Sequence, residues 1–383
     1  MKKITHSVWA GFVFLLTVPL FALSQPTNSK VADVSAGKKK PSISKEFFGE
    51  TAGQKVYQYT LNSSKGMLVK VINYGGAIID IITPDRNGKG GSLVLGFDSL
   101  SGYTGKRNAL MGAIVGRVAN RIANKTFTLD GKDYVLTSYI HGGVNGFDKK
   151  IWDTEELTGK KDVALRLTYF SKDGEEGYPG NLNATVVYTL TNKNELKITY
   201  SATTDKATPL VLTNHTYFNL SGGTDNKVLN TELSIAADQY LEADSDHIPT
   251  GTLLDVKGTP FDFTHTQTIE AKIAETRGGN GYDMTFALRN QTGKLAKIAT
   301  AYEPLNGRKM EVYTTEPGLV FYTSNHLSER VIGRGGKPFS KHGGFCMETQ
   351  HYPDAPHHPN FPNTILRPGE KFRSQTIYKF SVL

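Results

Sequence analysis

The sequence is poor in cysteine and lacks the signatures that bind phosphates. A single cysteine, Cys346, stands among 383 residues. One thiol cannot form a disulfide within the chain, and it cannot build a zinc site from several cysteines. No phosphate-cradling loop, dinucleotide fingerprint or nucleophile elbow occurs. The absences give no support to nucleotide-dependent chemistry or to a serine nucleophile.

Charge of one sign is not concentrated in the chain either. Lysine and arginine number 44 against 36 aspartates and glutamates, a formal charge of +8. From residue 46 onward the basic residues are scattered among acids, and no segment carries a helical stripe of lysines. Nucleic-acid binding therefore has little support. The three lysines at 38–40 are more typical of a solvated tail than of a contact with an anionic surface.

The N-terminus has the pattern of a secretory signal peptide. Lysines at positions 2 and 3 precede a mostly apolar stretch over residues 8–23, and small residues at 22 and 24 mark a cleavage point before Gln25. A single-span anchor is the alternative, but a glycine, a threonine and a proline interrupt the apolar stretch. We predict a signal peptide over residues 1–24 and an exported protein, periplasmic or secreted, with no membrane contact after cleavage.

Residues 25–45 are polar and basic, which predicts a flexible leader. Residues 46–383 show short alternating segments, no internal repeat and no linker, so we predict one domain there. The Asp130-Gly131 pair between 127–129 and 132–136 predicts a hairpin, and 184–191 should pair with 195–202. Only 268–276 looks helical. This density of strands predicts an all-β fold, an antiparallel sandwich or barrel.

Two polar clusters lie on segments too apolar for ordinary surface. The first contains Arg117, Asn120 and Arg121 among small apolar residues, where charged groups need partners. A buried pair with a carboxylate is the favoured interpretation for Arg117. Arg121 with Asn120 suits ligand hydroxyls equally well, because forked donors match them. The second cluster contains His215 and Tyr217, which share a face if the strand continues.

Three further positions admit both a structural and a functional interpretation. His141 precedes two glycines, a setting typical of a turn histidine. Asp283 ends a glycine-rich loop and has a turn aspartate as its default interpretation. Glu348 ends an apolar run; burial there would raise its pKa and make it a competent base, whereas a surface glutamate is the alternative. The histidines at 351, 357 and 358 lack recognised metal-ligand spacing, so we predict no metal.

These clusters, taken together, resemble the aldose 1-epimerase (galactose mutarotase) family. Eight motifs occur in the family's order across residues 46–383. The resemblance implies a large antiparallel β-sandwich. The motifs are GRVANRIA (116–123), HGG with GFDKKIW (141–152), DGEEGYPG (173–180), TPLVLTNHTYFNLSG (208–222), GYD (281–283), VYTTEPGLVFYTSN (312–325), GGFCMETQHYPDAPHHPNFP (343–362) and RPGE (367–370).

The resemblance also implies a role for each site residue. The general base falls on Glu348 and the general acid on His215. One departure concerns Val320, which stands where some relatives place a polar ligand contact, and this affects the fine specificity. Contacts with the sugar fall on Asn120, Arg121, His141, Thr216, Tyr217 and Asp283.

Anomerisation requires the anomeric hydroxyl to lose a proton while the ring oxygen gains one. We expect Glu348 to be the carboxylate that takes the first and His215 to be the imidazolium that gives the second. The expected pKa of His215 therefore lies above its reference of about 6.5. The reaction requires no cofactor, metal or covalent intermediate.

Two other functions remain open from the residues alone. A glycoside hydrolase would need two carboxylates, and Asp283 could partner Glu348. A non-catalytic sugar-binding protein would need no acid–base pair. The expected partner of the epimerase is a small free aldose, a hexose such as galactose or glucose, and the expected state is a monomer or weak dimer.

We predict that the mature chain begins near Gln25, because the small residues at 22 and 24 fit a signal peptidase. Intact-mass analysis of protein recovered from a cell-envelope fraction would measure this start. An uncut N-terminus would instead support the membrane anchor.

Overall fold

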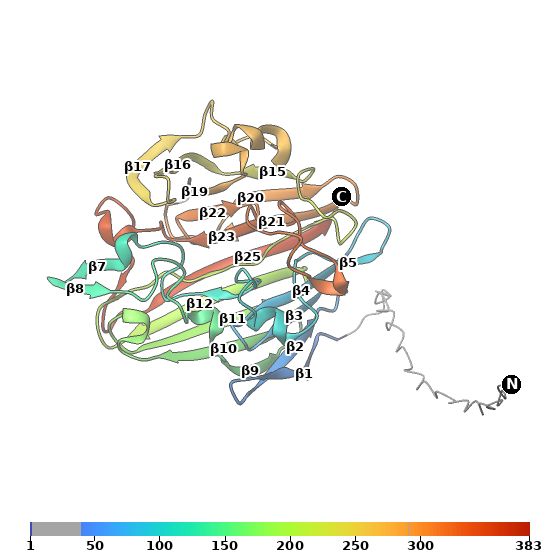
Figure 1. Ribbon diagram of the computed structural model, residues 1–383, viewed down its shortest axis with the longest axis horizontal. Helices are drawn as coiled ribbons and strands as arrows, with labels where there is room; N and C mark the ends of the chain where they lie inside the picture. Colours follow the sequence, from blue (N-terminus) through green and yellow to red (C-terminus); the bar gives the residue numbers. More distant parts are fainter. Residues whose placement is uncertain (2–39, 290) are drawn as a thin grey trace. The chain divides into compact units, whose positions relative to one another are not determined.

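Strands are the main type of secondary structure in the described chain (Figure 1). The computed structural model describes Met1, residues 40–289 and residues 291–383. The predicted signal peptide and most of the predicted leader lie outside the described residues. β1 begins at Ser42, before the boundary predicted at residue 46, because residues 42–45 already pair with β2. No helix among the described residues is long and apolar enough to cross a membrane.

The largest sheet has nine strands in the order β18-β15-β20-β21-β25-β12-β11-β10-β9, and each neighbouring pair is antiparallel. The predicted pairing around 192–194 is confirmed, with Leu190 opposite Leu196. The strands are β9 (Asp153–Thr158), β10 (Val163–Ser171), β11 (Leu182–Leu190), β12 (Glu195–Thr204), β15 (Glu232–Ile235), β18 (Gln267–Thr268), β20 (Ala296–Glu303), β21 (Arg308–Thr314) and β25 (Phe372–Val382).

Two five-stranded antiparallel sheets accompany it, in the orders β1-β2-β3-β4-β5 and β17-β16-β19-β22-β23. An antiparallel sandwich is therefore the observed architecture. The strands are β1 (Ser42–Thr51), β2 (Gln54–Asn62), β3 (Leu68–Ile72), β4 (Ile78–Pro84), β5 (Gly90–Ser92), β16 (Ala237–Ala243), β17 (Pro249–Asp255), β19 (Asp283–Leu288), β22 (Gly318–Tyr322) and β23 (Cys346–Gln350).

The remaining elements are short. The predicted hairpin is confirmed, with Asp130 and Gly131 at positive φ in its turn. The predicted helix at 268–276 is a 3-10 helix. Between β13 and β14, Val211 forms only an isolated bridge with Val118. These elements are α1 (Leu100–Thr104), β6 (Ile114–Val115), η1 (Ala123–Lys125), β7 (Thr126–Leu129), β8 (Lys132–Val135), η2 (Phe147–Lys149), η3 (Glu175–Gly177), β13 (Thr208–Pro209), β14 (Thr213–Asn214), η4 (Ile269–Glu275), η5 (Arg277–Gly279), η6 (Arg334–Gly336), η7 (Ala355–His357) and β24 (Ile365–Leu366).

The sheet that contains β19, β22 and β23 has two different faces. Side chains alternate along a strand, so one face of each strand enters the main hydrophobic core. Phe286, Phe321 and Met347 belong to that core. The opposite face carries the polar side chains of Asp283, Tyr322 and Glu348. In the strand register, Asp283 lies opposite Tyr322, and Glu348 lies opposite Val320. This second face carries the candidate site.

Arg117 is buried but does not form the predicted pair with a carboxylate. Its guanidinium donates to the Ser171 hydroxyl and carbonyl and to the carbonyls of Lys172 and Pro179, at 2.8–2.9 Å. Glu175 is reached only through the Ser171 hydroxyl, which donates to it. Burial lowers the pKa of Arg117 to about 10. The five donors of an arginine suit carbonyls that converge from several loops, and this network anchors the segment that carries Asn120 and Arg121.

Arg117→Met should lower the free energy of unfolding by at least about 3 kcal/mol, because several buried acceptors lose their donors at once. Denaturant unfolding measures the loss. Arg166→Met is the control: Arg166 pairs with Glu155 at the surface, and such pairs contribute less than about 1 kcal/mol. Equal losses in the two variants would contradict a structural role for the buried network.

Candidate active site

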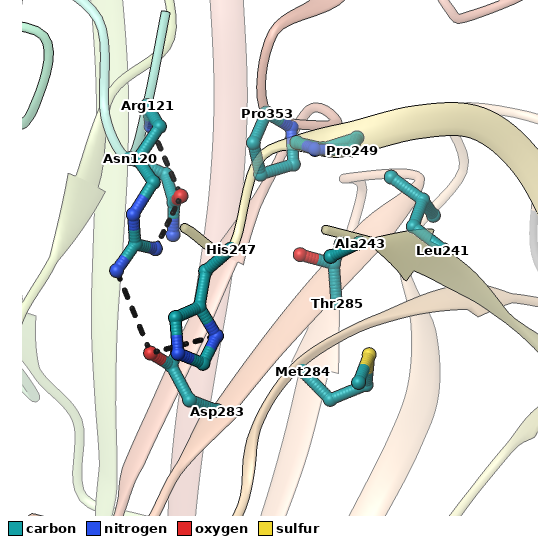
Figure 2. Close-up of a pocket in the computed structure, with 10 residues that line it drawn as sticks. All are labelled: Asn120, Arg121, Leu241, Ala243, His247, Pro249, Asp283, Met284, Thr285 and Pro353. Carbon is teal, nitrogen blue, oxygen red and sulfur yellow. Dashed lines mark hydrogen bonds and ion pairs between the residues drawn. The ribbon is translucent and has the colours of Figure 1, made fainter. Parts of the chain in front are cut away.

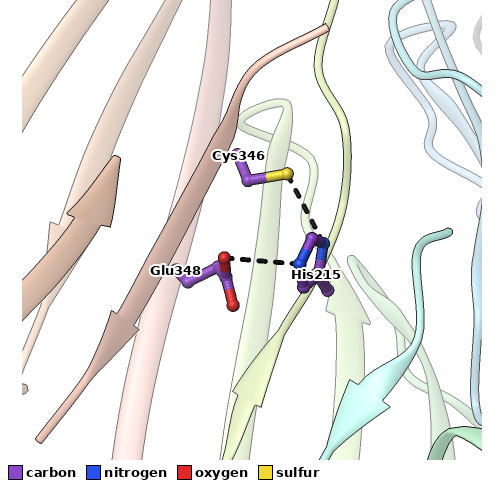
Figure 3. A group of neighbouring side chains, drawn as sticks. All are labelled: His215, Cys346 and Glu348. Atoms are coloured by element: carbon purple, nitrogen blue, oxygen red, sulfur yellow. Dashed lines mark hydrogen bonds and ion pairs between the residues drawn. The ribbon is translucent and has the colours of Figure 1, made fainter. Parts of the chain in front are cut away.

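Three segments distant in sequence meet at the polar face of the five-stranded sheet that contains β19, β22 and β23. β23 carries Glu348, and β19 begins at Asp283. The chain after β14 carries His215, and two backbone hydrogen bonds join its Phe218 to Phe345, the residue before β23. The strand pairings therefore place His215 beside Glu348 (Figure 3).

His215 and Glu348 form a buried pair. Nε2 of His215 lies 3.5 Å from Oε1 of Glu348, and the side chains are 6% and 2% exposed. The second carboxyl oxygen, Oε2, is buried and has no hydrogen-bond partner among the described residues. On the other side of the ring, the thiol of Cys346 lies 3.5 Å from Nδ1 (Figure 3). The imidazole thus presents Nε2, and the carboxyl group presents a free oxygen.

Burial controls the protonation of this pair. It raises the pKa of Glu348 to about 8, assisted by the negative charge of Asp283 and opposed by Arg121. Burial lowers the pKa of His215 to about 4. The raised pKa of Glu348 confirms the sequence prediction, whereas the expected rise for His215 is wrong. Removal from water penalises both charged forms, so the resting pair is a carboxylic acid beside a neutral imidazole.

His141 supplies a third polar group next to the pair. Its ring centroid lies 5.5 Å from that of His215. Nδ1 accepts the backbone N–H of Asn120 at 3.2 Å, so the neutral ring carries its proton on Nε2. Burial, His215 and Arg121 hold the pKa of His141 well below its usual value. His141 is therefore a hydrogen-bond donor that stays uncharged.

Gly142 allows this placement of His141. Its φ is +83°, and a Cβ there would lie 1.9 Å from the carbonyl oxygen of Gly116. Only glycine tolerates that contact, so Gly142 lets the His141 turn lie against the Gly116 segment.

Arg121, Asn120 and Asp283 form a second polar group (Figure 2). Arg121 Nη2 lies 3.6 Å from Asp283 Oδ2, and both side chains are 15% exposed. The Asn120 side-chain oxygen accepts from the backbone N–H of Arg121 at 2.9 Å and from its Nη1 at 3.3 Å. Nε of Arg121 is buried without a partner among the described residues. Forked donors beside a carboxylate suit the vicinal hydroxyls of a sugar.

The resemblance implies that Tyr217 and Thr216 bind hydroxyl groups of the sugar. In the structure, the hydroxyl groups of both residues bond to other parts of the chain. The Tyr217 ring lies 4.9 Å from the His215 ring, but its hydroxyl donates to the carbonyl of Ala109 at 3.0 Å. The structure does not bring Thr216 to the site: its hydroxyl donates to Asn214 at 2.5 Å on the opposite face of the chain. Tyr217 contacts the acid–base pair through its ring, and Thr216 belongs to a buried structural network.

The sequence did not reveal two residues that meet the site. The spacing of two between Cys346 and Glu348 on one strand is the signal that predicts a shared face. His247 lies in a turn, and its Nδ1 is 3.7 Å from Asp283 Oδ2 (Figure 2). No local pattern points to it, because the contact depends on how β16 and β17 pack beside β19.

The histidines of the loop after β23 lie beside carboxylate groups. His351 lies 2.6 Å from Glu316, and Asp354 lies 2.6 Å from His357 and 3.3 Å from His358.

Among the described residues, one group that could hold a metal ion, His215, Cys346 and Glu348, has its ligand atoms within 4.8 Å of one another. A zinc ion would need a thiolate and a carboxylate there. Burial instead raises the pKa of the Cys346 thiol and of the Glu348 carboxyl group, which favours their neutral forms.

The fold and the site define an all-β enzyme with a buried acid–base pair next to donors for hydroxyl groups. The sequence model of the family described as "Aldose 1-epimerase" matches residues 57–379. A galactose mutarotase of Rattus norvegicus is 41% identical over 348 residues, covering 89% of this chain and 99% of the relative.

An aldose 1-epimerase of Escherichia coli strain K12 is 37% identical, covering 86% of this chain and 96% of the relative. The crystal structure of a galactose 1-epimerase from Lactobacillus acidophilus superposes with a TM-score of 0.78 at 28% identity, covering 89% and 99% of the two chains. This chain therefore belongs to the aldose 1-epimerase family, isomerases that interconvert the anomers of sugars.

Proposed function

We propose that this protein opens and recloses the ring of a free aldose through Glu348 and His215. The observation that carries the proposal is the buried pair itself, in which Nε2 and Oε1 are 3.5 Å apart and Oε2 has no partner among the described residues. Glu348 takes the proton of the anomeric hydroxyl, and His215 gives one to the ring oxygen.

The pair carries one proton between its two pKa values, about 4 and about 8. In the resting site this proton is on Glu348. Its transfer to His215 produces the carboxylate and imidazolium that ring opening needs, without exchange with solvent. Ring opening then returns the pair to its neutral form, which suits the uncharged open aldehyde. The aldehyde turns about its C1–C2 bond, and the reverse transfers close the ring on the other face.

The surrounding donors hold the sugar during this rotation. His141 offers Nε2–H to the oxygen that gains negative charge. The sugar hydroxyl groups that are distant from the anomeric carbon are bound by Arg121, Asn120 and Asp283. Val320 lies opposite Glu348 and is 2% exposed, so it maintains the apolar surroundings of the carboxyl group and contributes no polar sugar contact.

Galactose and glucose are the proposed substrates, since the relatives are named for galactose and for aldoses in general. The hydrolase and sugar-binding alternatives gain no support from those relatives. We further propose that the protein acts outside the cytoplasm as a monomer or weak dimer, on the N-terminal pattern and the sequence composition alone. Polarimetry of fresh α-anomers of galactose, glucose, xylose and arabinose tests the activity and the substrate range; no acceleration with any of them would overturn the proposal.

Glu348→Gln and His215→Gln should each lower kcat by at least ~10²-fold with the fold intact, because each removes one half of the proton exchange. The double variant should lose far less than the product of the two effects, since either change breaks the same relay. Polarimetry measures the rates and circular dichroism checks the fold. An unchanged kcat in Glu348→Gln would exclude Glu348 as the base.

The pH profile of kcat/KM should be a bell with limbs near the two pKa values, about 4 and about 8. Below the lower one the pair takes up a second proton and no base remains; above the upper one it loses its only proton and no acid remains. Both limbs belong to the pair. His215→Gln should therefore show residual activity that rises with pH and then stays level. A complete bell in that variant would assign the acid to another residue, with His141 the first to test.

A further inference from the structure

The carboxylate of Asp283 lies between two nitrogen groups, and neither is in direct hydrogen-bond contact with it. Oδ2 is 3.6 Å from Arg121 Nη2 and 3.7 Å from His247 Nδ1. Both distances exceed the usual 2.7–3.2 Å of an N–H···O bond. Polar groups held slightly beyond bonding distance are commonly bridged by one further oxygen atom. The spacing therefore suits an oxygen that bonds to the carboxylate and to the nitrogens together.

A small cavity lies at this position (Figure 2). Its volume is about 20 Å³, which is enough for one oxygen atom of water size and not for a larger group. The polar residues of its wall are Asn120, Arg121, His247, Asp283 and Thr285. The rest of the wall is largely apolar, with Leu241, Met284 and Pro353 among its residues, so an oxygen placed there has only the polar wall to bond with.

His247 lines both this small cavity, which we call the chamber, and a second, larger cavity of about 380 Å³ that also shares Asp283 and Met284 with it. The residues that line the larger cavity do not include Glu348 or His215. A sugar that reacts at that pair, with a distal hydroxyl group at Asp283, would place this hydroxyl group in the chamber.

The fold holds the His247 side chain in this position. The residue is in the turn between β16 and β17, with φ +60°, and Asp244 accepts the backbone N–H of Asp246 at 2.8 Å and of Ile248 at 2.9 Å. The next residue but one, Pro249, is fixed by His358, whose Nε2 lies 3.1 Å from its carbonyl oxygen. The side chain of His247 is 41% exposed, yet it points to Asp283 (Figure 2).

We propose that His247 is a specificity-determining residue, which together with Asp283 and Arg121 binds a single hydroxyl group of the sugar. The inference rests on the proposed function and adds a contact from the β16–β17 turn to it. The chamber distinguishes sugars by whether they place a hydroxyl group, a larger group or no oxygen at this position. A site that merely exposed His247 to solvent would show no such dependence.

The test uses two variants that suit the backbone at this turn. His247→Gly and His247→Asn both tolerate a positive φ, and the asparagine side chain is too short to reach Asp283. Steady-state mutarotation is measured by polarimetry for galactose and for 2-deoxy-, 3-deoxy-, 4-deoxy- and 6-deoxygalactose. His326→Asn is the matched control, because the exposed His326 lines the larger cavity and not the chamber.

Both His247 variants should raise KM for galactose about 3- to 10-fold, as expected for one lost hydrogen bond, with kcat within about 2-fold. For one deoxy sugar the same variants should have no effect, because the hydroxyl group that His247 binds is already missing. This non-additivity identifies the hydroxyl group that occupies the chamber. His326→Asn should leave the relative preference among the five sugars unchanged.

The inference is overturned if the His247 variants match the wild type, if they affect all five sugars equally, or if they lower kcat without changing KM. It is also overturned if His326→Asn alters the sugar preference as they do. These outcomes differ from a failure of the proposed function, in which the wild-type protein accelerates mutarotation of none of the sugars. Circular dichroism confirms that each variant is folded before its kinetics are compared.

Discussion

The chemistry depends on one constraint: Glu348 and His215 share a place from which water is almost excluded. Their side chains are 2% and 6% exposed. In water each group would titrate at its ordinary pKa, and both would exchange protons with the solvent. Burial makes the charged forms costly and the neutral pair the resting state. A single proton can then move between them as the substrate changes between ring and open chain.

The fold creates this water-excluding environment because the two faces of one sheet have different roles. The inner face of β22 and β23 packs Phe321 and Met347 into the main core and fixes the strands. The outer face then holds Cys346 and Glu348 against the segment of His215. Rigid strands suit a reaction in which the distances between acid, base and sugar must be kept while the substrate rotates.

The polar side of the site depends on loops that are anchored elsewhere. Arg117 gathers the carbonyls of the 171–179 region and so holds the chain that leads to Asn120 and Arg121. At the other end, Asp354 accepts the backbone N–H of Ala123 at 2.9 Å and donates its own to the carbonyl of Arg121 at 2.9 Å. The loop that follows Glu348 thus restrains Arg121 as well, which links the base to the hydroxyl-binding group.

The sequence by itself determined the strand-rich fold and the hairpin at Asp130-Gly131, since these follow from local turn chemistry and a period of two. The motifs also indicated the family and the residues of the pair. Only the tertiary structure decided that Arg117 binds carbonyls, that Thr216 faces away, that the proton rests on Glu348, and that His247 reaches Asp283. Those outcomes depend on desolvation and on contacts between segments far apart in the chain, which no local pattern contains.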